Sequence, residues 1–227
     1  MTAAAGIDAH YDVIVAGGGS GGVAAAVGAA QAGAKTLLVE RAGFLGGAAT
    51  LSQVLAWCGF YPQADGAMPE PAVAGVGRLA LDHLAALGMD VAPYFSASGN
   101  WPIRLNPEAT KIALDRSVAA AGVTVALHTS VTRATAAGRV EAVVLQDPRG
   151  LHDVTADSFV DASGDAALAF LAGASPCPLH VPDRGAQPAS YPVRLSGAAR
   201  GASLDKSLRA KALDQIDRRL GLSLIHI

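Results

Sequence analysis

Residues 11–40 read YDVIVAGGGSGGVAAAVGAAQAGAKTLLVE, and this stretch determines the expected fold. The run Tyr11–Ala16 is apolar and β-branched and ends in glycines, which is typical of a buried parallel strand. The alanine-rich stretch from about Ser20 to Ala32 predicts a helix that Gly33 ends. A second strand is expected at Lys35–Glu40. Together these residues predict one βαβ unit of an α/β protein with a parallel sheet.

A glycine-rich turn joins the first expected strand to the helix. Its spacing is G-x-G-x-x-G, at the place where backbone amides and the positive end of the helix dipole can face a pyrophosphate. Gly17 permits a tight turn, Gly19 leaves room for a cofactor, and Gly22 lets helix and strand pack closely. A purely structural turn is the alternative. The candidate binding residues of the turn are Gly17, Gly18, Gly19, Ser20, Gly21 and Gly22.

Glu40 stands at the end of the second expected strand, about 20 residues after the glycines, as in dinucleotide-binding folds. A carboxylate there accepts hydrogen bonds from the adenosine ribose hydroxyls and repels a ribose 2′-phosphate, which disfavours NADP. The alternative is a solvated charge at a strand end. The glycines and Glu40 do not separate FAD from NAD, because both cofactors carry the same adenosine diphosphate half.

No third strand follows directly, and we expect a long excursion instead, with an insertion at about 51–105. Helices are predicted at about Ala72–Leu87 and Pro107–Ala121, the second capped by Asn106. The expected strands that follow are Val123–His128, a meander of Val131–Ala136, Val140–Gln146 and Leu151–Ala156, and a buried strand Phe159–Ala162. A helix from about Ala166 to Leu171 follows the last strand. The expected architecture is therefore a Rossmann-like domain with a parallel sheet and an antiparallel β-meander.

Composition narrows the function classes. The chain has 227 residues, is 51% hydrophobic and carries a formal net charge of -2, with no lysine or arginine block. These properties argue against a nucleic-acid partner or an anionic membrane surface. No apolar run is long enough for a membrane span and the start lacks a signal-peptide pattern, so we expect a cytoplasmic protein. Cys58 and Cys177 lack metal-ligand spacing, and we expect no metal site.

Three segments resemble the FAD-dependent oxidoreductase family that includes flavin subunits related to heterodisulfide reductase. They are residues 11–50, then NPEATKIALDRSVAAAGVTVALHT at 106–129, then FVDASGDAALAFLAGA at 159–174. The resemblance covers roughly residues 11–197. It implies FAD as the cofactor, bound on a glutathione-reductase-like fold in which a meander interrupts the crossover.

The resemblance also implies further cofactor-binding positions. The glycine pair lets the chain pass close to the FAD, the segment after it continues along the cofactor, and Arg41 flanks the adenosine end. Val131 lies near the adenine through its backbone, and the last expected strand ends on the cofactor. An ordinary strand-to-helix turn with Asp165 as helix cap is the alternative for that last position. The positions implied are Arg41, Gly46, Gly47, Ala48, Thr50, Val131, Ala162, Ser163, Gly164 and Asp165.

Two departures from related proteins limit the chemistry. Disulfide reductases of this superfamily carry a redox cysteine pair after the glycine pair, whereas this chain has alanines and Thr50 there, so dithiol relay chemistry is not expected. Some relatives bind [4Fe-4S] clusters, but two isolated cysteines cannot supply four thiolates. The aromatic segment Trp57–Tyr61 has two interpretations, as a lining of the flavin or substrate side and as core packing.

The expected function is a two-electron reaction in which an unidentified small-molecule substrate passes a hydride to the flavin. An electron-acceptor partner or a homo-oligomer is compatible with this function, and no catalytic residue is indicated. The alternatives are a truncated or non-catalytic dinucleotide-binding fragment and an NAD-binding Rossmann enzyme.

The expected domain layout has three parts. Residues 1–175 form an incomplete FAD-binding domain, and residues 176–221 begin a second, substrate domain with a helix at Leu204–Leu220. The last six residues, 222–227, read LSLIHI, which matches the translation of a sequencing-library adapter. We expect this tail to be an artefact, and a genuine apolar terminus is the alternative.

Overall fold

The computed structural model of the chain describes residues 6–63, 67–96 and 99–175. The chain divides into two compact units, Met1–Cys177 and Pro178–Ile227, and the fold below is that of the first. The predicted second domain at 176–221, its helix and the tail at 222–227 lie outside the described residues. Among the described helices, none combines the length and the apolar character that crossing a bilayer requires.

A six-stranded sheet in the order β5-β2-β1-β8-β7-β6 forms the centre of the first unit. Strands β5, β2, β1 and β8 are parallel, and β8, β7 and β6 continue as an antiparallel meander. A separate pair, β3 and β4, is antiparallel. The strands are β1 His10–Ala16, β2 Thr36–Val39, β3 Ala56–Trp57, β4 Ile103–Arg104, β5 Thr124–Ala126, β6 Ser130–Ala136, β7 Val140–Asp147 and β8 Gly150–Asp161. The predicted α/β class and meander are confirmed.

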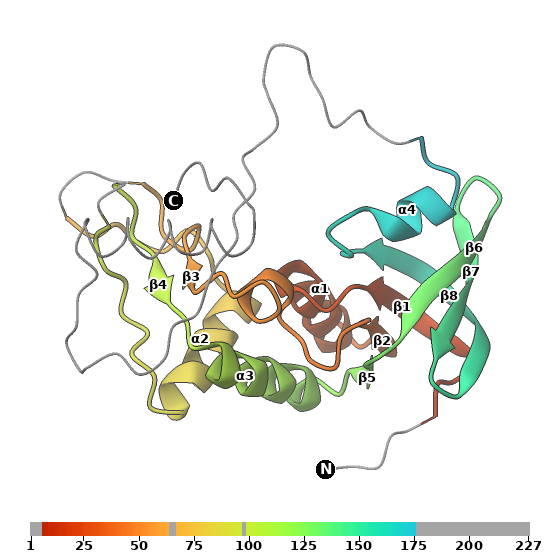
Figure 1. The fold of residues 1–227 in the computed structure, drawn as a ribbon, viewed down its shortest axis with the longest axis horizontal. Coiled ribbons are helices and arrows are strands. Elements are labelled where there is room, and N and C mark those ends of the chain that lie inside the picture. The colour runs from red at the N-terminus through yellow and green to blue at the C-terminus, as the bar shows by residue number, and fades with distance from the viewer. Residues whose placement is uncertain (1–5, 64–66, 97–98, 176–227) are drawn as a thin grey trace, which may run out of the picture. The chain divides into compact units, whose positions relative to one another are not determined.

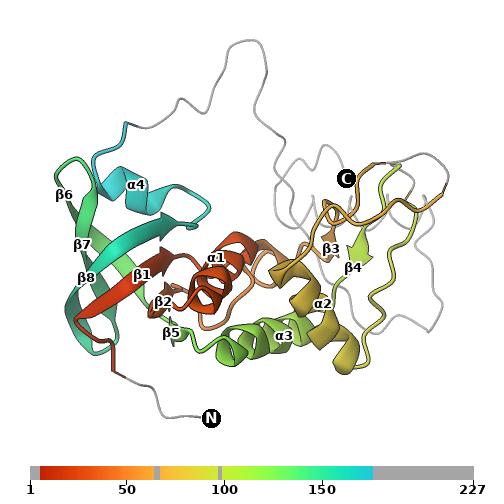
Figure 2. The ribbon, with the colours of Figure 1, turned by 180° about the vertical axis from the view of Figure 1, so that it is seen from behind.

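Helices cover both faces of this sheet, as Figures 1 and 2 show from opposite sides. The helices are α1 Ser20–Gln31, α2 Val76–Ala86, α3 Pro107–Ala120 and α4 Ala167–Leu171, of which α2 packs mainly on α3 and α1, and a 3-10 turn lies at Gly47–Ala49. Val15 and Leu38 of the sheet pack in one cluster with α1 and α3. Ile14 and Leu37 point to the other face, in a cluster that includes Leu168 of α4. This alternation explains why β1 and β2 are apolar on both faces.

Tight packing explains the composition of α1. Its buried positions carry only small or β-branched residues, Gly22, Val23, Ala26 and Val27, so the helix axis lies close to the sheet. The predicted cap of α3 is also present, since the Asn106 side chain accepts hydrogen bonds from the amides of Glu108 and Ala109.

One strand replaces the two that the sequence predicted at Leu151–Ala156 and Phe159–Ala162. β8 runs without a break, pairing with β7 through its first half and with β1 through its second half. Asp157 and Ser158, which fall between the two predicted strands, are exposed within β8. Polar residues at the point where a strand exchanges one partner for another do not interrupt it, because the ladder hydrogen bonds continue on one side or the other.

The first helix of the excursion also begins later than predicted. α2 starts at Val76, after Gly75 with a positive φ of 60°, rather than at Ala72. The amides of Ala72 and Val73 instead donate to the carbonyl of Phe60, which holds this stretch as an extended connection. Val73, which falls within the predicted helix, lies outside the observed one and is 37% exposed.

Candidate functional site

The glycine turn between β1 and α1 is built by close backbone packing. Gly17 has φ of 104°, and a Cβ there would overlap the Ala162 carbonyl at the end of β8. A Cβ at Gly22 would overlap the Gly17 carbonyl itself. These two glycines are therefore required by the protein's own packing, at the junction of β1, α1 and β8.

Two other glycines of the turn face open space. A Cβ at Gly19 would approach only the Gly47 Cα, at 3.9 Å, and a Cβ at Gly21 would meet nothing within 4 Å. No described side chain caps the amino terminus of α1, and its first turn holds no acidic residue. The first turn of a helix carries unpaired amides and a partial positive charge. This end of α1 is thus an open cradle for an anionic group such as a pyrophosphate.

The glycine pair after β2 packs directly against this cradle. Gly46 donates its amide to the Gly18 carbonyl at 2.8 Å, and it forms an isolated parallel bridge with Gly19. A Cβ at Gly47 would lie 3.0 Å from the Gly19 Cα. Both residues of the pair have positive φ, 115° and 51°. Only a segment without side chains can run this close to the turn.

Glu40 is buried, at 8% exposure, immediately after β2. One carboxylate oxygen accepts the Gly18 amide at 2.7 Å and the other accepts the Ala42 amide at 2.7 Å. The Glu40 backbone is held as well, by Ala126 and Thr129 of the β5 end. The side chain predicted to bind a ribose therefore also fixes the glycine turn. Since a carboxylate has about four acceptor sites, it retains capacity for a ligand hydroxyl.

A cavity of about 170 Å³ opens beside Glu40 at the carboxyl ends of the parallel strands. Ligands of open α/β sheets bind at this edge. Six of the predicted site residues, which come from four separate stretches of sequence, line it together. They are Gly17, Glu40, Arg41, Val131, Ser163 and Asp165. We call this space the Glu40 cavity.

The Glu40 cavity also contains residues that the sequence analysis missed. Thr129 lines it from the connection between β5 and β6, Ser130 from the start of β6, and Ala167 and Leu168 from α4. Thr129 is buried, and its amide donates to the Glu40 carbonyl at 3.0 Å. For Thr129 and Ser130, the strand order could have indicated this position. Because β5 lies beside β2, the residues that follow β5 reach the same sheet edge as Glu40.

The cap of α4 differs from the one predicted. Asp161 accepts hydrogen bonds from the Ser163 hydroxyl at 2.6 Å and the Ala169 amide at 2.8 Å, while the Ser163 hydroxyl accepts the Ala167 amide. Burial alone would raise the Asp161 pKa, but these hydrogen bonds lower it below its ordinary value. Asp165 is therefore not the cap that the alternative interpretation gave, and it is exposed and lines the Glu40 cavity.

The remaining predicted positions lie apart from the Glu40 cavity. Thr50 is buried and its hydroxyl donates to the Leu45 carbonyl at 2.7 Å, while Ala48 is exposed. Ala162 supports the turn through its backbone, since its amide donates to the Ala16 carbonyl. Gly164 is exposed with φ of 86°. The predicted residues thus divide between a cavity, a cradle and the packing beneath them.

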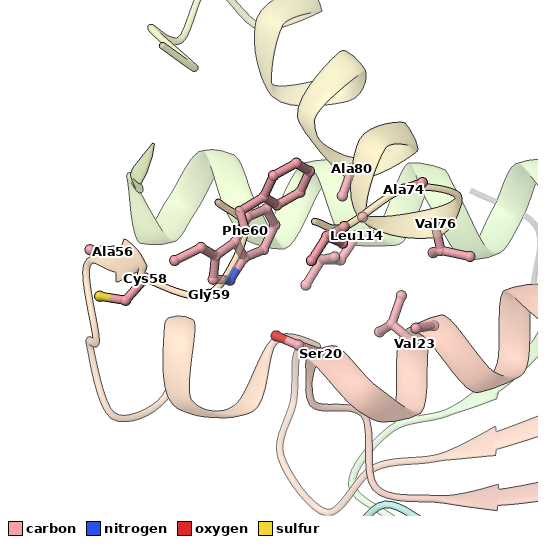
Figure 3. A pocket seen from close by; sticks show the side chains of 14 residues that line it. Ser20, Val23, Ala56, Cys58, Gly59, Phe60, Ala74, Val76, Ala80 and Leu114 are labelled. Atoms are coloured by element: carbon pink, nitrogen blue, oxygen red, sulfur yellow. The ribbon is translucent and has the colours of Figure 1, made fainter. Parts of the chain in front are cut away.

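A second, larger cavity of about 570 Å³ lies beyond the start of α1. Ser20 and Val23 of α1 face Phe60 and Ala80 across it, as Figure 3 shows. Trp57, Cys58 and Phe60 of the aromatic segment all line it. Phe60 also belongs to a buried cluster with Leu81 and Leu84, as core packing predicts. That this segment lines the flavin or substrate side stays a prediction. We call this space the apolar cavity.

Several solved structures resemble the chain. BexE, from a study of oxidation during BE-7585A biosynthesis, has a TM-score of 0.50 at 18% identity over 72% of this chain and 34% of its own. AlpK gives 0.50 at 17% identity, over 72% and 33%. A geranylgeranyl bacteriochlorophyll reductase-like protein from Thermoplasma acidophilum gives 0.47 at 21% identity, over 72% and 42%. The chain therefore spans less than half the length of each.

At these identities the structural likeness shows the fold alone, and no curated protein matches the chain in sequence. The family is shown by a different comparison. The family model described as FAD dependent oxidoreductase matches residues 12–215, which is most of the chain and includes the glycine turn, Glu40 and the end of β8. The chain belongs to the FAD dependent oxidoreductase family.

Proposed function

We propose that this protein binds FAD and is an oxidoreductase that takes two electrons, as a hydride, from a small-molecule substrate. The observation that carries the proposal is the open, uncapped start of α1 beside the Glu40 cavity. The amides around Gly19 and Gly21 would hold the pyrophosphate. Glu40 would accept the ribose hydroxyls, and Val131 would lie near the adenine.

Three features favour FAD over a nicotinamide dinucleotide. Glu40 lines the cavity, and its carboxylate would repel a ribose 2′-phosphate, which argues against NADP. The meander of β6, β7 and β8 stands between β5 and the return to the sheet, as expected for a glutathione-reductase-like flavoprotein. Family membership supports the same cofactor.

FAD, when bound, supplies the two-electron chemistry, because flavins accept and release hydride. The contribution of this chain would be binding and orientation. Gly17 and Gly22 set the turn geometry, Glu40 fixes the turn through the Gly18 amide, and the Gly46–Gly47 pair keeps side chains away from the cradle. The electrons would leave the protein to a separate acceptor.

A second candidate is favoured by one observation, that the chain spans less than half of the structures it resembles. In this alternative the chain is a dinucleotide-binding piece without chemistry of its own. Reduction of a dye acceptor by the FAD-loaded chain with turnover would support the oxidoreductase function. FAD binding without turnover would support the non-catalytic alternative.

The binding test is a titration of the chain with FAD and with NAD, followed by calorimetry and flavin fluorescence. We expect saturable FAD binding, weaker NAD binding, and a loss of FAD affinity of roughly tenfold or more in Gly19→Ala, because its methyl group would enter the cradle. Gly28→Ala is the matched control, since Gly28 lies exposed on the same helix with nothing within 4 Å of its Cβ position. Equal FAD affinities of the Gly19→Ala chain and the unmodified chain would contradict the proposed site.

A further inference from the structure

The apolar cavity is separate from the Glu40 cavity, and the two share no lining residue. The Glu40 cavity reaches the glycine turn at Gly17, whereas the apolar cavity reaches it at Ser20, the first residue of α1. The two spaces therefore adjoin opposite ends of the same short turn. A ligand in the apolar cavity would lie next to the cradle without occupying the proposed adenosine site.

The walls of the apolar cavity come from four stretches of the chain. α1 contributes Val23 and Ala24, β3 and its following turn contribute Trp57 and Phe60, α2 contributes Ala80 on the opposite side, and α3 contributes Leu114. Figure 3 shows Phe60, Ala80 and Leu114 gathered on one side, with Val23 and Ser20 on the other. A concave space with walls from several packed elements is typical of a small-molecule site.

Small residues on the lining helices determine the shape of this space. Ala24 and Ala80 are alanines on helices that line it, and Gly77 is a glycine inside α2. A Cβ at Gly77 would lie 2.7 Å from Val73 and 3.3 Å from Phe60, so the glycine lets these two walls approach α2. The volume of about 570 Å³ falls within the range of sites that enclose drug-sized ligands.

The charge and polarity of the lining side chains determine which class of ligand the cavity can bind. Among the described residues that line the cavity, none is an aspartate, glutamate, lysine, arginine or histidine. The only polar side-chain groups that these residues contribute are the Ser20 hydroxyl, the Trp57 indole N–H and the Cys58 thiol. A charged ligand would lose its hydration here without gaining an ion pair, whereas the burial of a hydrocarbon surface would be favourable.

We propose that the apolar cavity binds an uncharged, predominantly hydrocarbon small molecule, with at most one or two hydrogen-bonding groups that meet Ser20 or Trp57. We further propose that this cavity is the substrate site, and this part rests on the proposed function. The cavity itself is tested without FAD. The other possible occupant, an apolar protein segment that fills the cavity permanently, is an outcome of the same test.

The test uses the 227-residue chain and the neutral dye N-phenyl-1-naphthylamine, whose fluorescence rises in apolar surroundings. We expect saturable binding of one dye per chain, with 1-decanol displacing it at a concentration at least tenfold lower than decanoate does at pH 8. The two competitors have the same chain length and differ in charge. Equal potency of the alcohol and the carboxylate, or no saturable dye binding because a segment fills the cavity, would overturn the proposal.

Substitutions in the cavity wall test whether the dye binds in the apolar cavity. Ala24→Phe fills the space and Ala24→Glu adds a charge to its wall, and each should weaken dye binding at least tenfold. Ala85→Phe is the matched control, because Ala85 is also an exposed helical alanine but does not line the cavity. Energy transfer from Trp57, which lines the cavity, to the bound dye is a second readout, and it needs no substitution that fills the cavity. It is measured in a Trp101→Phe background, which leaves Trp57 as the only tryptophan of the sequence. Dye binding that survives both Ala24 variants, or absence of this transfer, would also overturn the proposal.

The FAD titration separates this inference from the proposed function. If the dye binds as expected but FAD does not, the cavity stands as a ligand site and the redox function fails. If FAD binds and the dye does not, the redox function stands and the cavity proposal fails.

Discussion

The Glu40 carboxylate accepts the Gly18 amide at 2.7 Å, although the two residues are 22 positions apart in the sequence. Its other oxygen accepts the Ala42 amide at the same distance. In dinucleotide-binding folds, the role of the acidic residue at this position is to accept hydrogen bonds from the ribose of the ligand. Here it also joins the end of β2 to the glycine turn, so the turn depends on Glu40 before any ligand arrives.

We therefore expect Glu40→Gln to destabilise the protein by about 1–3 kcal/mol. A glutamine has one acceptor oxygen in place of two, so its NH₂ group would face one of the two buried amide donors and leave that donor unpaired. The measurement is the free energy of unfolding in urea. Glu70→Gln, at an exposed glutamate, is the control. If the two variants were equally stable, the Glu40 hydrogen bonds would have no structural role.

Local signals predicted the part of the fold that local interactions determine. The βαβ unit, the Asn106 cap and the glycine turn were all predicted within a few residues, because apolar periodicity, capping side chains and glycine spacing act over short distances. The six predicted residues that line the Glu40 cavity could be found for two reasons. Gly17 and Glu40 stand at a characteristic spacing. Arg41, Ser163 and Asp165 lie in segments that resemble the family, and Val131 was implied by the same resemblance.

Features that depend on tertiary partners were not predicted. β8 was divided in two because its exchange of partner from β7 to β1 leaves no mark in the sequence other than polar residues. α2 was started too early because Ala72 and Val73 bond to Phe60, a residue from the preceding loop. The apolar cavity was not predicted as a set, since its walls come from four distant stretches. Only Trp57–Tyr61 was recognised as a possible lining.

Neighbouring glycines of the turn should respond in opposite ways to alanine. In Gly22→Ala the added methyl group would overlap the Gly17 carbonyl, and we expect a loss of about 3 kcal/mol of stability through overpacking against the backbone. Gly21→Ala adds its methyl group where nothing lies within 4 Å, and alanine favours helix by up to about 1 kcal/mol. Urea unfolding of both variants measures the difference. Similar losses in the two variants would show that the close contact at Gly22 does not determine its identity.

The turn between β7 and β8 predicts a pH dependence of stability. Asp147 is buried and lies 2.9 Å from His152 Nε2, and it accepts hydrogen bonds from the Arg149 side chain at 2.8 Å and from the amides of Arg149 and Gly150. The contact with His152, followed by the hydrogen bonds with Arg149, lowers the Asp147 pKa well below its ordinary range, and burial only partly opposes this.

A carboxylate whose pKa is lower in the folded state than in the unfolded state stabilises the fold above its unfolded pKa of about 3.9. This contribution is lost as the pH falls from about 4 toward the lower folded pKa. Asp147→Asn removes the titrating group, so we expect lower stability at pH 7 and a flatter decline below pH 4. Urea midpoints measured from pH 7 down to pH 2.5 test this, with Asp153→Asn as the control at an exposed position of β8. An Asp147→Asn curve parallel to that of the unmodified protein below pH 4 would show that the paired carboxylate does not control acid stability.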